Sequence, residues 1–83
     1  MNRLIQYEMV CVRKILFPES DYDGWRLNKR KPQVGDTGTL IDILEVTGSP
    51  PRYVVESSGK DGATIFISEF TAEEIEPIGN ETH

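Results

Sequence analysis

The sequence has little of the material from which most catalytic and metal sites are built. Its 83 residues include one cysteine, Cys11, and one histidine, His83 at the last position. An internal disulfide is therefore excluded, and one thiol with one imidazole does not make a cluster of soft metal ligands. Because Cys11 stands between two valines with no histidine nearby in the sequence, we expect it to act as a small buried or half-buried hydrophobe, not as a nucleophile.

Long apolar runs are also missing. No stretch approaches the ~20 residues of a membrane span, and the first residues lack the uninterrupted apolar segment of a signal peptide. These absences predict a cytoplasmic protein with no membrane partner. A chain of this length forms one small domain with a thin core, which argues against a deep catalytic cleft, so we expect no enzymatic activity and no cofactor. The domain is expected to span residues 1–83, with its core over about 7–78 and a flexible tail at 79–83.

Positive charge is scarce, and it is unevenly placed. Fourteen acidic and nine basic residues give a formal net charge of −5. Residues 1–35 hold seven basic and four acidic groups, whereas residues 36–83 hold two basic and ten acidic groups. This balance argues against nucleic acids and anionic membranes as general partners, and it favours another protein, one of basic character.

Short runs rich in β-branched residues predict an all-β fold, with strands at 8–16, 39–46, 52–57, 63–68 and 75–78. A long connection, residues 17–33, follows the first strand, and the Asp-Gly pair at 61–62 predicts a tight hairpin. Thr71, followed three residues later by Glu74, fits a capping box that would hold one helical turn. This order is typical of a single five-stranded SH3-like barrel with a long first loop and one short helical turn before the last strand. The residues expected in its core are Val10, Val12, Leu40, Ile43, Val54, Ile65, Ile67 and Ile75.

Four segments carry a resemblance to known proteins: Gly-Asp-Thr-Gly-Thr at 35–39, Tyr-Val-Val-Glu at 53–56, Asp-Gly at 61–62 and Ala-Glu-Glu-Ile-Glu-Pro at 72–77. The chain from Val34 to Ile78 resembles KOW and SH3-like barrels, and more narrowly a family of small uncharacterised bacterial domains with a Gly-Asp-x-Gly-Thr turn. The resemblance implies the fold and no catalytic residues. It differs from peptide-binding SH3 domains, which have a tryptophan at the start of the third strand, where this chain has Arg52 and Tyr53.

The long connection contains two charged motifs. Asp-Tyr-Asp-Gly at 21–24 suggests a calcium loop, but Trp25, Arg26 and Pro32 stand where the pattern requires an oxygen ligand, glycine and glutamate. A polar turn is the better interpretation. The basic run at 29–31 suggests contact with RNA, although acidic residues surround it, and a solvated loop is the simpler interpretation.

The sequence therefore favours a non-enzymatic protein-binding module whose acidic surface docks a basic partner. One concrete version is an immunity or antitoxin-type inhibitor of a basic nuclease toxin; the alternatives are a KOW-like module associated with RNA or the ribosome, and an accessory subunit of an enzyme. Trp25 fits equally a core position that closes the barrel and an exposed anchor at an interface. The residues expected to bind protein are Tyr22, Trp25 and Arg26 as anchors, with Asp42, Glu45, Glu56, Glu73 and Glu74 as steering charges.

Overall fold

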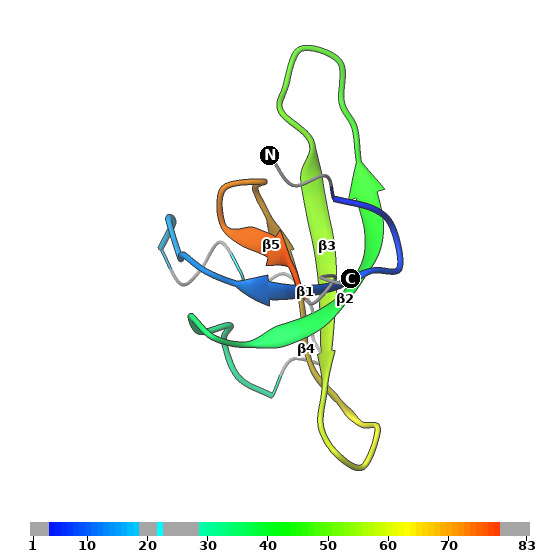
Figure 1. The fold of residues 1–83 in the computed structure, drawn as a ribbon. Helices are drawn as coiled ribbons and strands as arrows, with labels where there is room; N and C mark the ends of the chain where they lie inside the picture. Colours follow the sequence, from blue (N-terminus) through cyan, green and yellow to red (C-terminus); the bar gives the residue numbers. More distant parts are fainter. Residues whose placement is uncertain (1–3, 19–21, 23–28, 79–83) are drawn as a thin grey trace.

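The protein is an all-β chain with one antiparallel sheet (Figure 1). The computed structural model describes residues 4–18, 22 and 29–78. The five strands follow the order β4-β3-β2-β1-β5 across the sheet, so β4 and β5 form its edges and the sheet is not closed. The all-β prediction and the number of strands are confirmed. The strands are β1 (Met9–Val12), β2 (Thr37–Leu44), β3 (Arg52–Ser58), β4 (Thr64–Phe70) and β5 (Ile75–Pro77).

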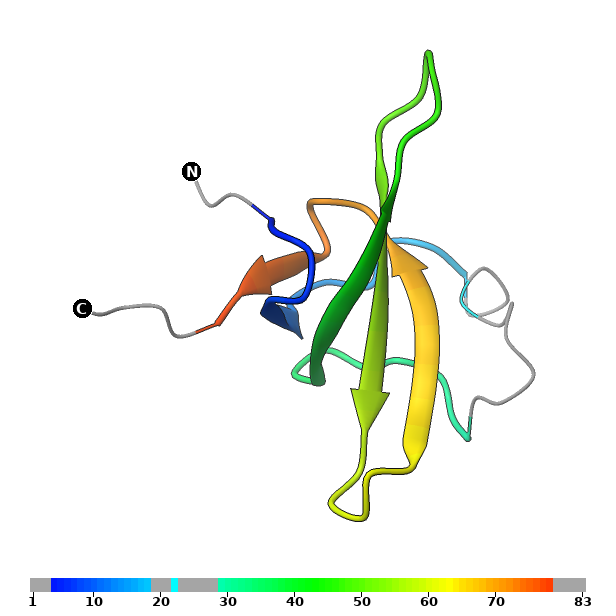
Figure 2. The same ribbon diagram turned by 90° about the vertical axis from the view of Figure 1, so that its right-hand side faces the viewer.

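The second strand joins the two parts of the sheet. The start of β2 pairs with β1 between Thr37 and Thr39, and the rest of β2 pairs with β3 from Thr39 to Leu44. β2 bends between these partners, so that β1 lies across the direction of β3 and β4 (Figures 1 and 2). A Cβ atom at Gly38 would lie 2.5 Å from the carbonyl oxygen of Glu56. Only glycine therefore allows the two backbones to approach this closely at the bend.

A β-bulge in β2 sets the direction of the side chains beyond the bend. Leu40 lies opposite Val55, but Asp42, two residues later, lies opposite Val54, one residue earlier in β3. The extra residue changes the alternation of inward and outward side chains along β2. As a result Leu40 and Ile43 both pack on the core, and Asp42 is exposed.

The core lies on one face of the sheet. It contains Val10, Val12, Tyr22, Leu40, Val55, Phe66, Phe70 and Ile75. The expectations for Val10, Val12, Leu40 and Ile75 are confirmed, and Ile43 packs against the core as a partly buried residue. Val54 is buried but does not belong to this core cluster. In β4 the fully buried face is one residue out of register with the expectation, although Ile65 still packs against the core as a partly buried residue. Phe66, Ser68 and Phe70 are buried, and Ile65 and Ile67 are half-buried, because the larger aromatic rings occupy the inner face.

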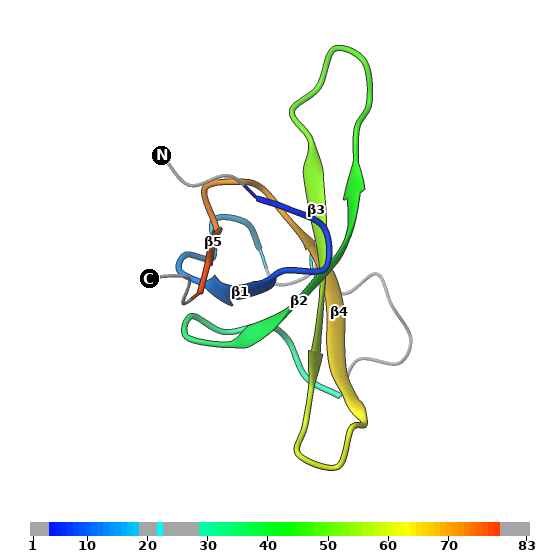
Figure 3. The same ribbon diagram turned by 45° about the vertical axis from the view of Figure 1, so that its right-hand side comes forward.

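The connections at the two ends of β3 extend in opposite directions (Figure 3). At one end the β3–β4 turn contains Gly62 at φ +83°, as the Asp-Gly pair predicts. Residues 71–74, between β4 and β5, form a hydrogen-bonded turn and not the expected helical turn. In this turn the N–H of Glu74 donates to the carbonyl of Thr71, 3.1 Å away.

Within the described residues, no helix has the length and apolar character to span a membrane.

Candidate functional site

The outer face of β2, β3 and β4, opposite the core, carries three carboxylates around one valine. Val54, at the centre, lies directly opposite Asp42 of β2 and Glu69 of β4. Glu56 follows Val54 by two residues along β3 and therefore shares its face. Residues opposite each other in antiparallel strands also share a face. Asp42, Glu56 and Glu69 are called the acidic face below, and the β2 bulge is the reason that Asp42 belongs to it.

A groove of about 530 Å³ lies at one end of the acidic face. Three separate segments line it: the chain after β1, the β2–β3 connection with the adjoining strand ends, and the end of β4. This end groove is formed by Phe17, Leu44, Val46, Ser49, Pro50, Arg52, Glu69 and Thr71. Four of the lining residues are apolar, and all four are exposed in the isolated chain: Phe17 at 41%, Leu44 at 37%, Val46 at 64%, and Pro50.

The two charged residues of the end groove are only loosely paired. Arg52 Nη2 lies 4.0 Å from Glu69 Oε1, and both side chains are partly exposed. Among the described residues, Nε of Arg52 is buried without a hydrogen-bond partner. A buried N–H donor that lacks an acceptor costs roughly 1–3 kcal/mol. The groove also presents the partly exposed guanidinium of Arg52 and carboxylate of Glu69, which are not tightly paired with each other.

Tyr22 and Glu74, expected as an anchor and a steering charge, are both buried in the isolated chain and are not available at its surface. Tyr22 is 3% exposed and Glu74 is fully buried. The Tyr22 hydroxyl donates to Glu74 Oε2, and the Tyr22 ring packs on Phe70 with ring centroids 5.6 Å apart. The reason is that Glu74 serves as an acceptor for backbone and side-chain donors that would otherwise be buried without a partner.

Glu74 joins three segments of the chain. Its Oε2 also accepts from the N–H of Leu16 at 3.1 Å, and its Oε1 accepts from the N–H of Thr71 at 2.8 Å and from the Thr71 hydroxyl at 3.2 Å. The N–H of Phe17 donates to the Tyr22 hydroxyl at 3.2 Å. Burial, together with the hydrogen bond to Glu74, raises the pKa of Tyr22 to about 12. The cluster fixes Phe17 and Thr71, which line two sides of the end groove.

The other predicted binding residues fall into two groups. Asp42, Glu45 and Glu73 are exposed, and Glu56 is half-buried, with its Oε2 accepting from the Thr64 hydroxyl at 2.7 Å. Asp42 and Glu56 are brought together on the acidic face, whereas Glu45 lies beyond the end of β2 and Glu73 lies in the turn before β5. Trp25 and Arg26 lie outside the described residues.

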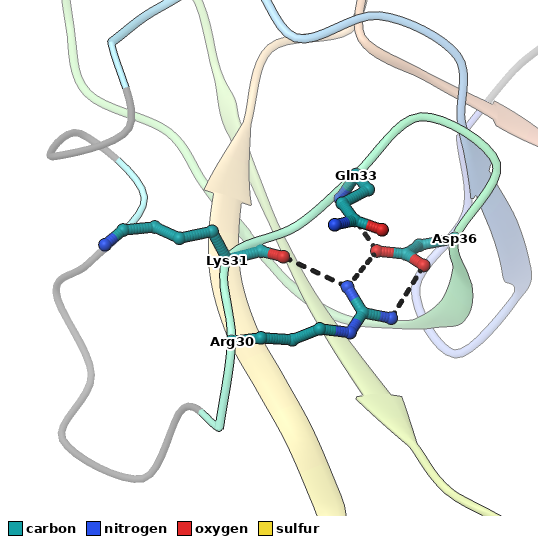
Figure 4. Close-up of polar contacts among 4 residues, drawn as sticks. All are labelled: Arg30, Lys31, Gln33 and Asp36. Carbon is teal, nitrogen blue, oxygen red and sulfur yellow. Dashed lines mark hydrogen bonds and ion pairs between the residues drawn. The ribbon is translucent and has the colours of Figure 1, made fainter.

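The basic run at 29–31 is partly neutralised by an acidic residue of the same loop (Figure 4). Both terminal nitrogens of Arg30 bond to the Asp36 carboxylate, at 2.8 and 2.9 Å, and Nη1 also donates to the carbonyl of Lys31 at 3.0 Å. Asp36 Oδ2 accepts from the N–H of Gln33 as well. The bonds from Arg30 hold the pKa of Asp36 below its usual value. Arg30 is therefore committed to a structural contact within the chain.

The sequence interpretation missed most of the end groove. The sequence places Phe17, Leu44, Val46 and Arg52 only in strands and connections. The available signal was the run Leu-Glu-Val at 44–46, which comes shortly before two prolines and leaves apolar side chains at a strand end.

Among the described residues, no three His, Cys, Asp or Glu side chains group as metal ligands. No protein-family model, curated protein or solved structure matches the chain.

Proposed function

We propose that the protein is a non-enzymatic binding module that docks a basic protein partner against the acidic face. The observation that carries the proposal is the convergence of Asp42, Glu56 and Glu69 from three strands onto one rigid surface. Carboxylates fixed on a sheet give a localised negative potential, which speeds encounter with a positive surface and sets its orientation. The exposed apolar side chains of the end groove, next to this face, supply area that a partner can bury.

The finer description of the fold belongs to the same proposal. We assign the sheet to the SH3-like class. The strand order, in which β1 lies between β5 and β2 and the bent β2 is shared by two groups of strands, supports the assignment. In this arrangement the β2–β3 connection and the turn at 71–74 lie at the same end of the sheet (Figure 2), which is where the end groove is found.

One concrete form of the proposal is an inhibitor that covers the basic surface of a nuclease toxin. A compact acidic chain of this size is suited to that task because nucleases bind phosphates through clustered cations. This form predicts that the partner loses nuclease activity in the complex. An RNA-binding role is less well supported, since Arg30 already pairs with Asp36 in the basic loop.

The proposal is tested by affinity capture from cell extract with three versions of the chain. The wild type should retain one basic protein in stoichiometric amount at low salt. The double variant Asp42→Asn/Glu56→Gln should lose most of it. The control Asp61→Asn/Glu76→Gln makes the same change in net charge on the β3–β4 turn and on β5, and it should retain the partner. No retained protein, equal losses from both variants, or retention of RNA alone would contradict the proposal.

A further inference from the structure

The end groove is open and mostly apolar, and polar residues also contribute to its lining. Its volume of about 530 Å³ lies within the range of about 300–1,000 Å³ that is typical of ligand sites. Val46 is 64% exposed and Phe17 is 41% exposed, so the walls stand open to solvent. An open groove between loops and a strand end suits an extended polypeptide better than a small molecule, which needs enclosure on most sides.

The polar groups of the groove favour the chemistry of a peptide backbone. The side chain of Arg52 is 42% exposed, and its only ion pair among the described residues is the 4.0 Å contact from Nη2 to Glu69. A peptide carbonyl is a neutral acceptor that would satisfy such a guanidinium without competing for charge. The carboxylate of Glu69, which is partly exposed and 4.0 Å from Arg52, can accept from a second group of the ligand.

The charge around the groove indicates what that second group is. Glu69 lies across Val54 from Asp42, and Glu45 stands between the lining residues Leu44 and Val46 in the sequence. Three carboxylates against one guanidinium leave a net negative field at this end of the sheet. A basic side chain is therefore preferred beside Glu69, and apolar side chains are preferred against Phe17, Leu44 and Val46.

We propose that the end groove binds an extended segment of the partner protein in which an arginine lies between apolar residues. This inference rests on the proposed function, because it specifies how the basic partner reaches the chain. The arginine pairs with Glu69 and faces Asp42, the apolar neighbours pack on the groove walls, and a backbone carbonyl of the segment accepts from Arg52.

The test is an NMR titration of the full chain with three short peptides, acetylated and amidated at their ends. The first has an arginine flanked by leucines in a serine and glycine background; the second replaces the arginine by glutamine; the third replaces the leucines by serines. The first peptide should shift the amide signals of Leu44, Val46, Ser49 and Thr71 saturably. The second and third peptides should bind with an affinity that is lower by roughly fivefold or more, since each lacks one of the two contacts.

Matched variants separate the groove from general charge attraction. Glu69→Gln should weaken the first peptide about threefold to fivefold, whereas Glu76→Gln, at a carboxylate that also pairs with an arginine on the surface, should not. Val46→Ser should weaken it about fivefold, whereas Val34→Ser, at an equally exposed valine outside the groove, should not. Because these side chains are exposed, the variants should keep the dispersed spectrum of the folded chain.

The outcomes distinguish this inference from the proposed function. If no peptide binds saturably, or if the shifts fall on residues outside the groove, the groove proposal is overturned. The same holds if the three peptides bind equally. The proposed function is decided separately by the capture experiment with Asp42→Asn/Glu56→Gln, which leaves every lining residue of the groove unchanged.

Discussion

The buried carboxylate of Glu74 makes the sharpest prediction about stability. In Glu74→Ala, the hydroxyl of Tyr22 and the N–H groups of Leu16 and Thr71 lose their acceptor at once. Each buried donor left without a partner costs roughly 1–3 kcal/mol. Allowing for water that enters the space, the total is about 3–5 kcal/mol. A domain of this size has a free energy of unfolding of about 4–12 kcal/mol, so the variant should be close to unfolding.

Glu73 provides the matched control, since it is the same residue type one position earlier and is exposed. Glu73→Ala should change the free energy of unfolding by less than about 0.5 kcal/mol. Glu74→Gln should fall between the two, at about 1–2 kcal/mol, because an amide keeps one acceptor oxygen but turns an N–H₂ group toward other donors.

The assay is equilibrium unfolding in urea at neutral pH, followed by circular dichroism. The predicted order of midpoints is wild type and Glu73→Ala together, then Glu74→Gln, then Glu74→Ala, with unchanged slopes. If Glu74→Ala unfolded at the same urea concentration as Glu73→Ala, the hydrogen-bonded cluster would not be what fixes the chain after β1 to the turn before β5, and the reasoning would be refuted.

Three further predictions concern pH and packing. The pKa of Tyr22 is raised from 10 to about 12 in the folded chain. The free energy of unfolding should therefore keep its full Tyr22 contribution below about pH 10 and lose about 2–3 kcal/mol between about pH 10 and 12. Urea midpoints of Tyr22→Phe should lack this loss. Because the pKa of Asp36 is lowered, its contribution to the free energy of unfolding is present above the usual aspartate pKa and disappears as the pH falls. Asp36→Asn should therefore cost about 1 kcal/mol at pH 7 and progressively less in acid. Equal costs at pH 7 and in acid would contradict the pairing with Arg30. Gly38→Ala places its Cβ against the carbonyl of Glu56 and should lower the thermal midpoint through a loss of about 1–3 kcal/mol, whereas an unchanged midpoint would mean that the bend in β2 gives way freely.

The strands could be predicted from the sequence because their signals are local. β-branched residues, the Asp-Gly pair at 61–62 and the two prolines at 50 and 51 mark elements within a few residues. The choice of inner face in β4 could not be made locally. Ile65 and Ile67 are as apolar as Phe66 and Phe70, and the choice depends on which set packs against Tyr22 and the other strands.

The candidate site was less accessible to sequence reasoning than the fold. Asp42 and Glu56 were expected to be exposed charges, but their common face depends on a one-residue bulge that no composition rule reveals. Glu73 and Glu74 are chemically identical neighbours, and the buried one is distinguished by contacts with residues far away in the sequence: Tyr22, 52 positions earlier, and Leu16, 58 positions earlier. Long-range pairing therefore decides which carboxylates remain available to a partner.

The most direct test of the central claim is the association rate constant for the purified partner, measured by stopped flow over a range of salt concentrations. If the acidic face steers the encounter, the rate constant should fall steeply with salt and should drop several-fold in Asp42→Asn/Glu56→Gln, while Asp61→Asn/Glu76→Gln stays near the wild type. Equal rate constants for the two double variants, or a wild-type rate constant that does not depend on salt, would contradict the claim.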